Sequence, residues 1–264
     1  MTLGRYKALP ARPIGTGRTG RHQRAWADSG TVAHGLGHYA DMSSLQRTKA
    51  WLGTARYLAR HPQEARRVPR WFPQRSLSPI AIRVPWWPYD AITWMAGHLP
   101  AGARVFEYGG GGSTLWLEDH GAIVTCAEHH EAWYQQLGLA VRPSTRLMYR
   151  ASAATGTIGS EVEPGFLDSY VDAISDEPDA SLDLVIVDGR ARVECVRRAM
   201  PKVKPGGLLL LDDTGRPRYG LAIAMLADWE RHVFEGLKPG DVFPGQTSVW
   251  RRPGGPPADP GVLA

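Results

Sequence analysis

Cysteine is almost absent from the sequence, which has only Cys126 and Cys195 among its 264 residues. Neither lies in a pairing or metal motif and both have apolar neighbours, so we expect two buried thiols in a reducing compartment. Long apolar runs are also absent. The longest, Ala122–Cys126 and Gly207–Leu211, are strand-sized and far short of the ~18 residues of a membrane span. The sequence therefore predicts a cytoplasmic protein without a membrane partner.

Acidic residues are missing from the first 27 positions, which contain six of the basic residues. The formal net charge of +5 therefore comes from an N-terminal arm, and the remainder of the chain is close to neutral. The arm has no apolar core of a secretory leader, and its prolines and glycines break an amphipathic helix. We accordingly expect no basic face for nucleic acid, and we regard nucleic acid as an unlikely partner.

An apolar content of 43% with ten tryptophans provides for one sizeable buried core. Composition shifts divide the chain into four parts. These are a flexible basic arm over 1–41, a helical and then aromatic, proline-rich lid segment over 42–89, a regular domain over 90–252 and a disordered tail over 253–264. Within the lid segment, the density of prolines over 61–88 predicts an irregular loop packed by its own aromatic side chains.

Strand-like and helix-like patterns alternate along the regular domain, which predicts an α/β fold with a doubly wound, mostly parallel sheet of seven strands. A short Gly/Pro-rich gap over 238–246 predicts a terminal hairpin and an antiparallel last strand. The expected strands are Arg104–Tyr108, Ile123–Glu128, Arg146–Arg150, Leu182–Asp188, Gly207–Leu211, His232–Leu237 and Thr247–Arg251. The expected helices are Ser43–Arg60, a helix capped by Asp90 and running to Leu99, Ser113–Asp119, His130–Leu137, Phe166–Ile174, Arg192–Val203 and Tyr219–Arg231.

Four glycines, Gly109 to Gly112, join the first of these strands to its helix. Glycines at such a junction allow a tight turn and a close approach to a ligand, and the following helix directs its free N–H groups to the same place. A dinucleotide fingerprint would require glycine at position 114, where the chain has threonine. Glu107 would also repel a pyrophosphate, so a nicotinamide cofactor is disfavoured.

The segment from Glu107 to Ser113 resembles the first motif of class I S-adenosylmethionine-dependent methyltransferases, with serine in place of its third glycine. The resemblance implies a Rossmann-like domain in which the loop backs the methionine part of the cofactor. It also implies that Glu128, 21 residues after Glu107 at the end of the second strand, accepts the ribose hydroxyls. The cofactor-binding residues expected on this basis are Glu107, Tyr108, Gly109, Gly110, Gly111, Ser113, Thr114, Glu128, His129, Ser152, Asp188 and Arg190.

Three aspartates end the fourth and fifth strands, Asp188 on one and Asp212 with Asp213 on the other. Ligands of open α/β sheets bind at this edge. The spacing resembles that of magnesium-dependent O-methyltransferases, which implies a Mg²⁺ site on the three carboxylates. The alternative is that Asp212 or Asp213 caps the next helix and that Asp188 only orients a ligand. Without a metal, Asp188 or His129 is the expected catalytic base.

Aromatic residues gather just before the regular domain, and Trp86, Trp87 and Tyr89 are expected to form a wall for a planar or apolar substrate. The alternative is that each simply covers a helix. The sequence thus predicts a methyltransferase that acts on a small molecule, at a hydroxyl oxygen, in natural-product tailoring. Two alternatives stay open: a cyclase or cofactor-binding regulator on the same scaffold, and an RNA or protein methyltransferase. The oligomeric state also stays open, a dimer included.

Overall fold

The computed structural model describes residues 43–160 and 162–254. The arm expected over 1–41 and nearly all of the tail expected over 253–264 lie outside these residues. The described chain has a seven-stranded sheet in the order β3-β2-β1-β4-β5-β7-β6, in which β7 alone runs antiparallel to its neighbours. The strands are β1 (Arg104–Tyr108), β2 (Ile123–Glu128), β3 (Arg146–Tyr149), β4 (Leu182–Val187), β5 (Val203–Asp212), β6 (Glu230–Gly236) and β7 (Gly245–Arg251). The predicted fold class, including the antiparallel last strand, is confirmed.

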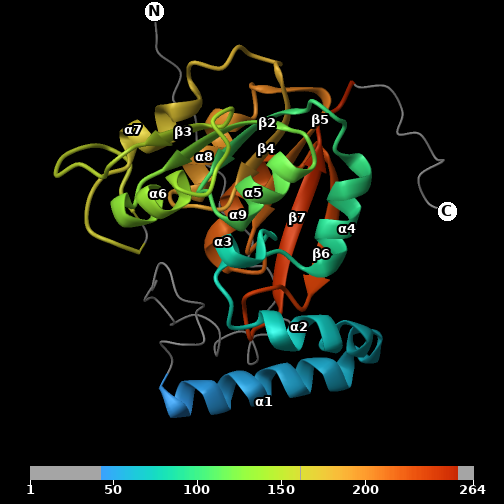
Figure 1. Ribbon diagram of the computed structural model, residues 1–264. Helices are drawn as coiled ribbons and strands as arrows, with labels where there is room; N and C mark the ends of the chain where they lie inside the picture. The colour runs from blue at the N-terminus through green and yellow to red at the C-terminus, as the bar shows by residue number, and fades with distance from the viewer. Residues whose placement is uncertain (1–42, 161, 255–264) are drawn as a thin grey trace, which may run out of the picture. The chain divides into compact units, whose positions relative to one another are not determined.

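Helices cover both faces of the sheet (Figure 1). On one face α7 (Asp168–Val171), η3 (Asp172–Ile174), α8 (Arg192–Ala199) and α9 (Gly220–Met225) share an apolar cluster with β1, β4 and β5. On the other, α4 (Tyr89–His98) and α5 (Gly112–Asp119) share a second cluster with alternate residues of the same strands. Because successive side chains of a strand point to opposite faces, the continuous apolar runs of β4 and β5 fill both clusters.

The remaining helices are α1 (Ser44–Arg60), η2 (Pro62–Arg67), α2 (Val68–Gln74), α3 (Pro79–Ile82), α6 (Glu131–Gly138) and η4 (Pro217–Tyr219). The helix predicted over Ser43–Arg60 is confirmed almost to the residue, and Ser43 caps it together with Gln46. The cap predicted at Asp90 is wrong, because Tyr89 is already helical and Asp90 instead pairs with Arg67. No helix in the described ranges is both long and apolar enough to cross a bilayer.

The irregular loop predicted over 61–88 is wrong, because much of this segment is helical. Pro62, Pro69 and Pro79 each stand in the first two positions of a short helix, where a missing N–H costs nothing. Trp71 and Tyr89 from this part of the chain form a small apolar cluster with Leu237. The segment therefore packs against the β6–β7 loop, close to which α1 and α2 lie in Figure 1.

Candidate functional site

The carboxyl ends of β1, β2, β4 and β5 meet at one edge of the sheet and bring most of the predicted residues together. The β1–α5 turn begins at Gly109, whose φ of +84° is in the left-handed region that favours glycine. A Cβ added to Gly109 would lie 2.6 Å from the Cα of Gly189, so this glycine permits the turn after β1 to touch the turn after β4. The first glycine is thus required by a contact within the protein.

Glu107 lies beneath the glycine turn and is completely buried. Its carboxylate accepts hydrogen bonds from the hydroxyls of Ser113 and Thr114, the latter at 2.5 Å, and the Thr114 hydroxyl in turn accepts the N–H of Gly111 at 2.9 Å. Burial raises the pKa of Glu107 to about 7, against the opposing effect of these two hydroxyls. The three side chains therefore form an internal support that fixes the shape of the turn.

Glu128 ends β2 and is 3% exposed. Its Oε1 accepts the backbone N–H groups of His129 and His130, each at 2.8 Å, and lies 3.0 Å from Nδ1 of His129. In the described part of the chain no donor meets Oε2. The carboxylate is thus held rigidly at the strand end with one oxygen available to a ligand that carries hydroxyl donors.

His129 lies between two carboxylates, with Nδ1 near Glu128 and Nε2 3.4 Å from Oε1 of Glu163. Burial alone would lower the pKa of His129, but the hydrogen bond and charge of Glu128, together with Glu163, raise it. Glu163 also accepts from Nε of Arg190 at 2.8 Å. Arg190 therefore joins His129 through Glu163, a residue of the β3–α7 connection that sequence reasoning missed.

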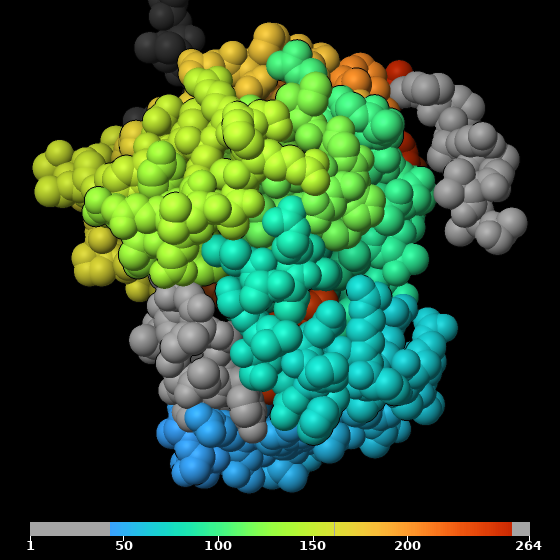
Figure 2. All heavy atoms as spheres, in the orientation of Figure 1, coloured from blue at the N-terminus to red at the C-terminus, as the bar shows by residue number. Residues whose placement is uncertain are grey.

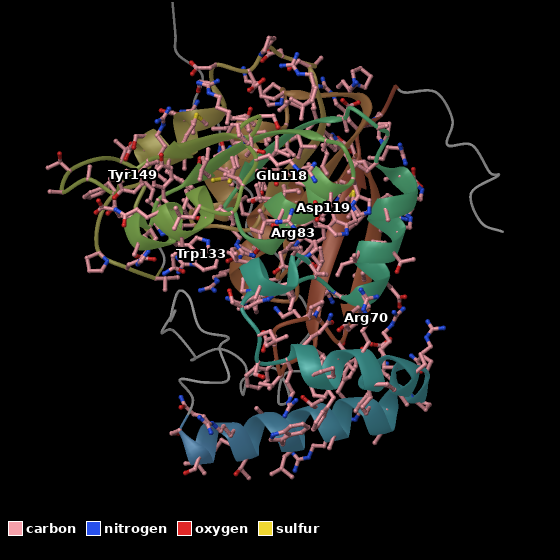
Figure 3. All side chains as sticks on the ribbon, in the orientation of Figure 1. Arg70, Arg83, Glu118, Asp119, Trp133 and Tyr149 are labelled. Atoms are coloured by element: carbon pink, nitrogen blue, oxygen red, sulfur yellow. The ribbon has the colours of Figure 1, made fainter. Side chains whose placement is uncertain are left out.

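Trp133, in the first turn of α6, is a second residue that sequence reasoning missed. Its indole N–H donates to the carbonyl of Gly110 at 2.7 Å, and a Cβ on Gly111 would lie 3.6 Å from its ring. Trp133 is labelled in Figure 3. Arg83 and Asp119, which form an ion pair at the end of α5, are labelled there too. The ring thus covers the glycine turn from the β2 side. An aromatic residue soon after the second strand was the available signal in the sequence.

Asp188 follows β4 and retains 20% of its side-chain surface. Its Oδ1 lies 3.0 Å from Nη2 of Arg192, and its Oδ2 accepts the indole N–H of Trp87 at 3.4 Å. Burial, followed by repulsion from Asp212, raises the pKa of Asp188 well above its ordinary value. Asp188 is therefore a partly open carboxyl group, beside a buried tryptophan, at the edge that carries the glycine turn.

Asp212 and Asp213 are brought close to Asp188, as the sequence predicted. Arg192 is inserted among them, with Nη1 3.5 Å from Asp213, 3.9 Å from a carboxylate oxygen of Asp212 and 2.7 Å from the Asp212 carbonyl. Burial tends to raise the pKa of Asp213, but the charges of Lys238, Arg192 and the more exposed Arg216 lower it to about 2. The pKa of Asp212 is raised, chiefly by burial and by Asp213.

The predicted Mg²⁺ site does not fit these residues. Arg192 and the ammonium of Lys238 lie among the carboxylates and pair with them, while the Thr247 hydroxyl donates to Asp212. Within residues 43–160 and 162–254, no three His, Cys, Asp or Glu side chains are arranged to hold a metal ion. The prediction failed because residue order alone does not show that Arg192, four residues after Asp188, and Lys238, just after β6, place their cations among the carboxylates.

Four other predicted residues have different surroundings. The Tyr108 side chain is buried beneath the sheet and its hydroxyl donates to the Val171 carbonyl at 2.6 Å, which leaves only its backbone at the turn. Ser152 is exposed beside Gly165. Trp86 lies over Gly240, and Tyr89 donates to Gln74 at 2.7 Å. Of the expected aromatic wall, Trp87 contacts the aspartate cluster directly.

Several solved structures have a similar fold. A 1,6-didemethyltoxoflavin-N1-methyltransferase from Burkholderia thailandensis is 12% identical over 81% of this chain and 92% of its own, with a TM-score of 0.42. A methyltransferase-like protein from Silicibacter pomeroyi is 24% identical over 61% of this chain and 84% of its own, with a TM-score of 0.40. A precorrin 8W decarboxylase from Methanobacterium thermoautotrophicum is 13% identical over 61% and 87%, with a TM-score of 0.42. No protein-family model and no curated protein matches the sequence.

Proposed function

We propose that this protein is an S-adenosylmethionine-dependent methyltransferase that acts on a small molecule at a hydroxyl oxygen. The observation that carries the proposal is the pairing of Glu128 with the glycine turn on adjacent strands. Oε1 of Glu128 is fixed by two backbone N–H groups, and Oε2 remains available beside the turn. Two vicinal hydroxyls of a ribose are the donors that a strand-end carboxylate in this position is suited to hold.

The chain's own residues at this edge are of the kinds that such a cofactor needs. Glu128 would hold the ribose, and the glycine turn, supported by Glu107 and covered by Trp133, would lie against the amino-acid part. The N–H groups at the start of α5 point to the same turn. When bound, the cofactor supplies an electrophilic methyl group.

Asp188 is the base that this proposal uses. A hydroxyl acceptor must lose its proton during the transfer, and a carboxyl group with a raised pKa is a better proton acceptor than an ordinary one. His129, the other expected base, faces a carboxylate with each ring nitrogen, and this favours a role in fixing Glu128 and Glu163. Trp87, which is fully buried and donates to Asp188, would hold this carboxyl group in place from the core side.

The proposal is tested by incubating the protein with methyl-labelled S-adenosylmethionine and a panel of phenols, alcohols and amines. Transfer of label to a hydroxyl compound supports it. Asp188→Asn should then reduce kcat by about 10²- to 10⁴-fold, because the proton acceptor is lost, while S-adenosylhomocysteine binds nearly as before. Asp172→Asn, at a half-exposed carboxylate that pairs with Arg198, is the matched control and should keep full activity. Label transferred only to amines would contradict the assignment to oxygen.

A further inference from the structure

A buried lysine reaches the aspartate cluster from the β6–β7 loop, residues 237–244. Lys238 is 7% exposed, and its ammonium lies 3.8 Å from Oδ1 of Asp213 and 3.4 Å from Oδ2 of Asp241. Its aliphatic stem lies along Gly245, where an added Cβ would approach its Cδ to 3.0 Å. A fully desolvated ammonium is costly unless it is paired, so this position implies strong compensation by the carboxylates.

Charge at the cluster is partly compensated within the chain, by two buried cations that face four carboxyl groups. Asp188, Asp212, Asp213 and Asp241 supply the carboxyl groups, and Lys238 and Arg192 are the buried cations among them. Asp213 itself has a φ of +60°, so the turn after β5 that aims it at Lys238 and Arg192 is strained. The attraction of the Asp213 carboxylate to Lys238 and to Arg192 offsets this strain.

The N-terminal segment, residues 44–74 with α1, η2 and α2, fixes the loop that carries Lys238. The carboxylate of Glu64 accepts the N–H of Leu237 at 3.0 Å, and the indole of Trp71 donates to the carbonyl of Asp241 at 2.7 Å. The hydroxyl of Thr54 donates to the carbonyl of Val242. Three helical elements, α1, η2 and α2, therefore bind both sides of Lys238 through the loop backbone.

We propose that Lys238 is a positioning residue that supplies, from within the chain, the positive charge that holds the carboxylates of the acceptor side, in place of a divalent ion. The assignment of that side to the acceptor rests on the proposed function. The methyl transfer would then require no metal, and the N-terminal segment would be needed to keep Lys238 in place. This proposal concerns the β6–β7 loop and its contacts with the N-terminal helices. The glycine turn and Glu128 take no part in those contacts.

The experiment compares the wild type with Lys238→Ala, using Mn²⁺ as the probe and electron paramagnetic resonance to detect its binding. We expect the wild type to bind no Mn²⁺ at the cluster and to have the same Tm in EDTA and in millimolar Mg²⁺. Lys238→Ala should lose roughly 10 °C of Tm, because carboxylates are left buried without their partner. It should also gain saturable Mn²⁺ binding and recover part of its Tm with Mg²⁺.

Lys204→Ala is the matched control, because Lys204 pairs with Asp183 at the opposite edge of the same sheet and is more exposed. It should change the Tm little and gain no Mn²⁺ binding. A folded Lys238→Ala that binds no Mn²⁺ would overturn the proposal. So would wild-type Mn²⁺ binding that is lost in Asp213→Asn, a result that decides the question even where Lys238→Ala fails to fold.

The proposed function is tested by a different measurement, the binding of S-adenosylhomocysteine. Absence of S-adenosylhomocysteine binding to the wild type would refute the methyltransferase assignment and leave the metal response of the Lys238 variant unaffected. A metal-binding wild type that still binds S-adenosylhomocysteine would refute only the role of Lys238.

Discussion

At the scale of single residues, the two glutamates that the sequence singled out have different roles. Glu107 is enclosed by Ser113 and Thr114, and Glu128 keeps one oxygen free of donors from the described chain. Glu107 is the residue before the last of β1 and Glu128 is the last of β2, but only Glu128 is placed to touch a ligand. Glu107 acts through the shape of the turn.

Replacement of Glu128 by alanine should weaken S-adenosylhomocysteine binding by about 1–3 kcal/mol, because two ribose hydroxyls lose a charged acceptor. Isothermal titration calorimetry measures the change, which corresponds to a dissociation constant roughly 5- to 150-fold higher. Glu131→Ala, at an exposed position of the following helix, is the control and should bind normally. An unchanged constant in Glu128→Ala would show that this carboxylate does not hold the ribose.

Glu107 should make stability depend on pH. Burial raises its folded pKa to about 7 from an unfolded value near 4.5, so the unfolded chain releases its proton first as the pH rises. The stability of the wild type relative to Glu107→Gln should therefore be greatest below about pH 4.5. It should fall between about pH 4.5 and 7 by up to about 3 kcal/mol, and then level off. Urea unfolding of both proteins at pH 5 and pH 8 tests this, and an equal difference at both pH values would contradict it.

Sequence reasoning located the acids at the strand ends because their spacing follows from a strand–helix–strand unit. It could not locate Arg192 and Lys238, because what makes them important is proximity to Asp188 and Asp213 in the folded chain. Arg192 begins a predicted helix and Lys238 lies in a predicted turn, and either pattern is equally typical of an exposed cation. The charge balance of the site was therefore beyond what residue order alone reveals.

At the scale of the elements, all seven strands were predicted, and β1 to β4 agree to within one residue. β5 begins four residues earlier than predicted, and β6 and β7 each begin two residues earlier. β1 and β2 have the expected bounds, because each is a short, largely apolar run that is followed by the glycine turn or ended by an acidic residue. The error over 61–88 has a physical reason. Prolines three to seven residues apart predict that no helix continues through this segment, but three of them stand at the start of short helices. Propensity alone does not distinguish the start of one helix from the interior of another.

Two glycines of the turn should respond differently to substitution by alanine. Gly109→Ala should destabilise the protein markedly, because of its positive φ and the contact with Gly189. Gly111→Ala, with extended backbone and only the Trp133 ring 3.6 Å away, should fold as the wild type does. If the turn lies against the cofactor, the added methyl group at position 111 should still weaken S-adenosylhomocysteine binding. Thermal unfolding and calorimetry of the pair separate the two effects, and normal binding in Gly111→Ala would contradict the cofactor position.

At the scale of the whole molecule, charge is divided between the N-terminal helices and the sheet domain. Residues 43–83 contain nine Lys and Arg residues and one acidic residue, Glu64, so the basic excess does not end with the arm. Lys49, Arg56, Arg60, Arg66 and Arg70 in this segment are exposed (Figure 2 shows its helices in blue and teal). Glu64 is buried and bound to the β6–β7 loop. The expectation that nucleic acid is an unlikely partner thus remains a prediction, and the charge that bears on it includes these helices.

The central claim, that this sheet edge binds S-adenosylmethionine, is tested most directly by the effect of ligands on thermal unfolding. S-adenosylhomocysteine at 100 times its dissociation constant should stabilise the wild type by about 2.7 kcal/mol. For a chain of this size, that is a rise of roughly 5–10 °C in Tm. NAD should give no rise, because Glu107 and Thr114 depart from a dinucleotide site, and Glu128→Ala should reduce the response to S-adenosylhomocysteine. Stabilisation by NAD and none by S-adenosylhomocysteine would contradict the account.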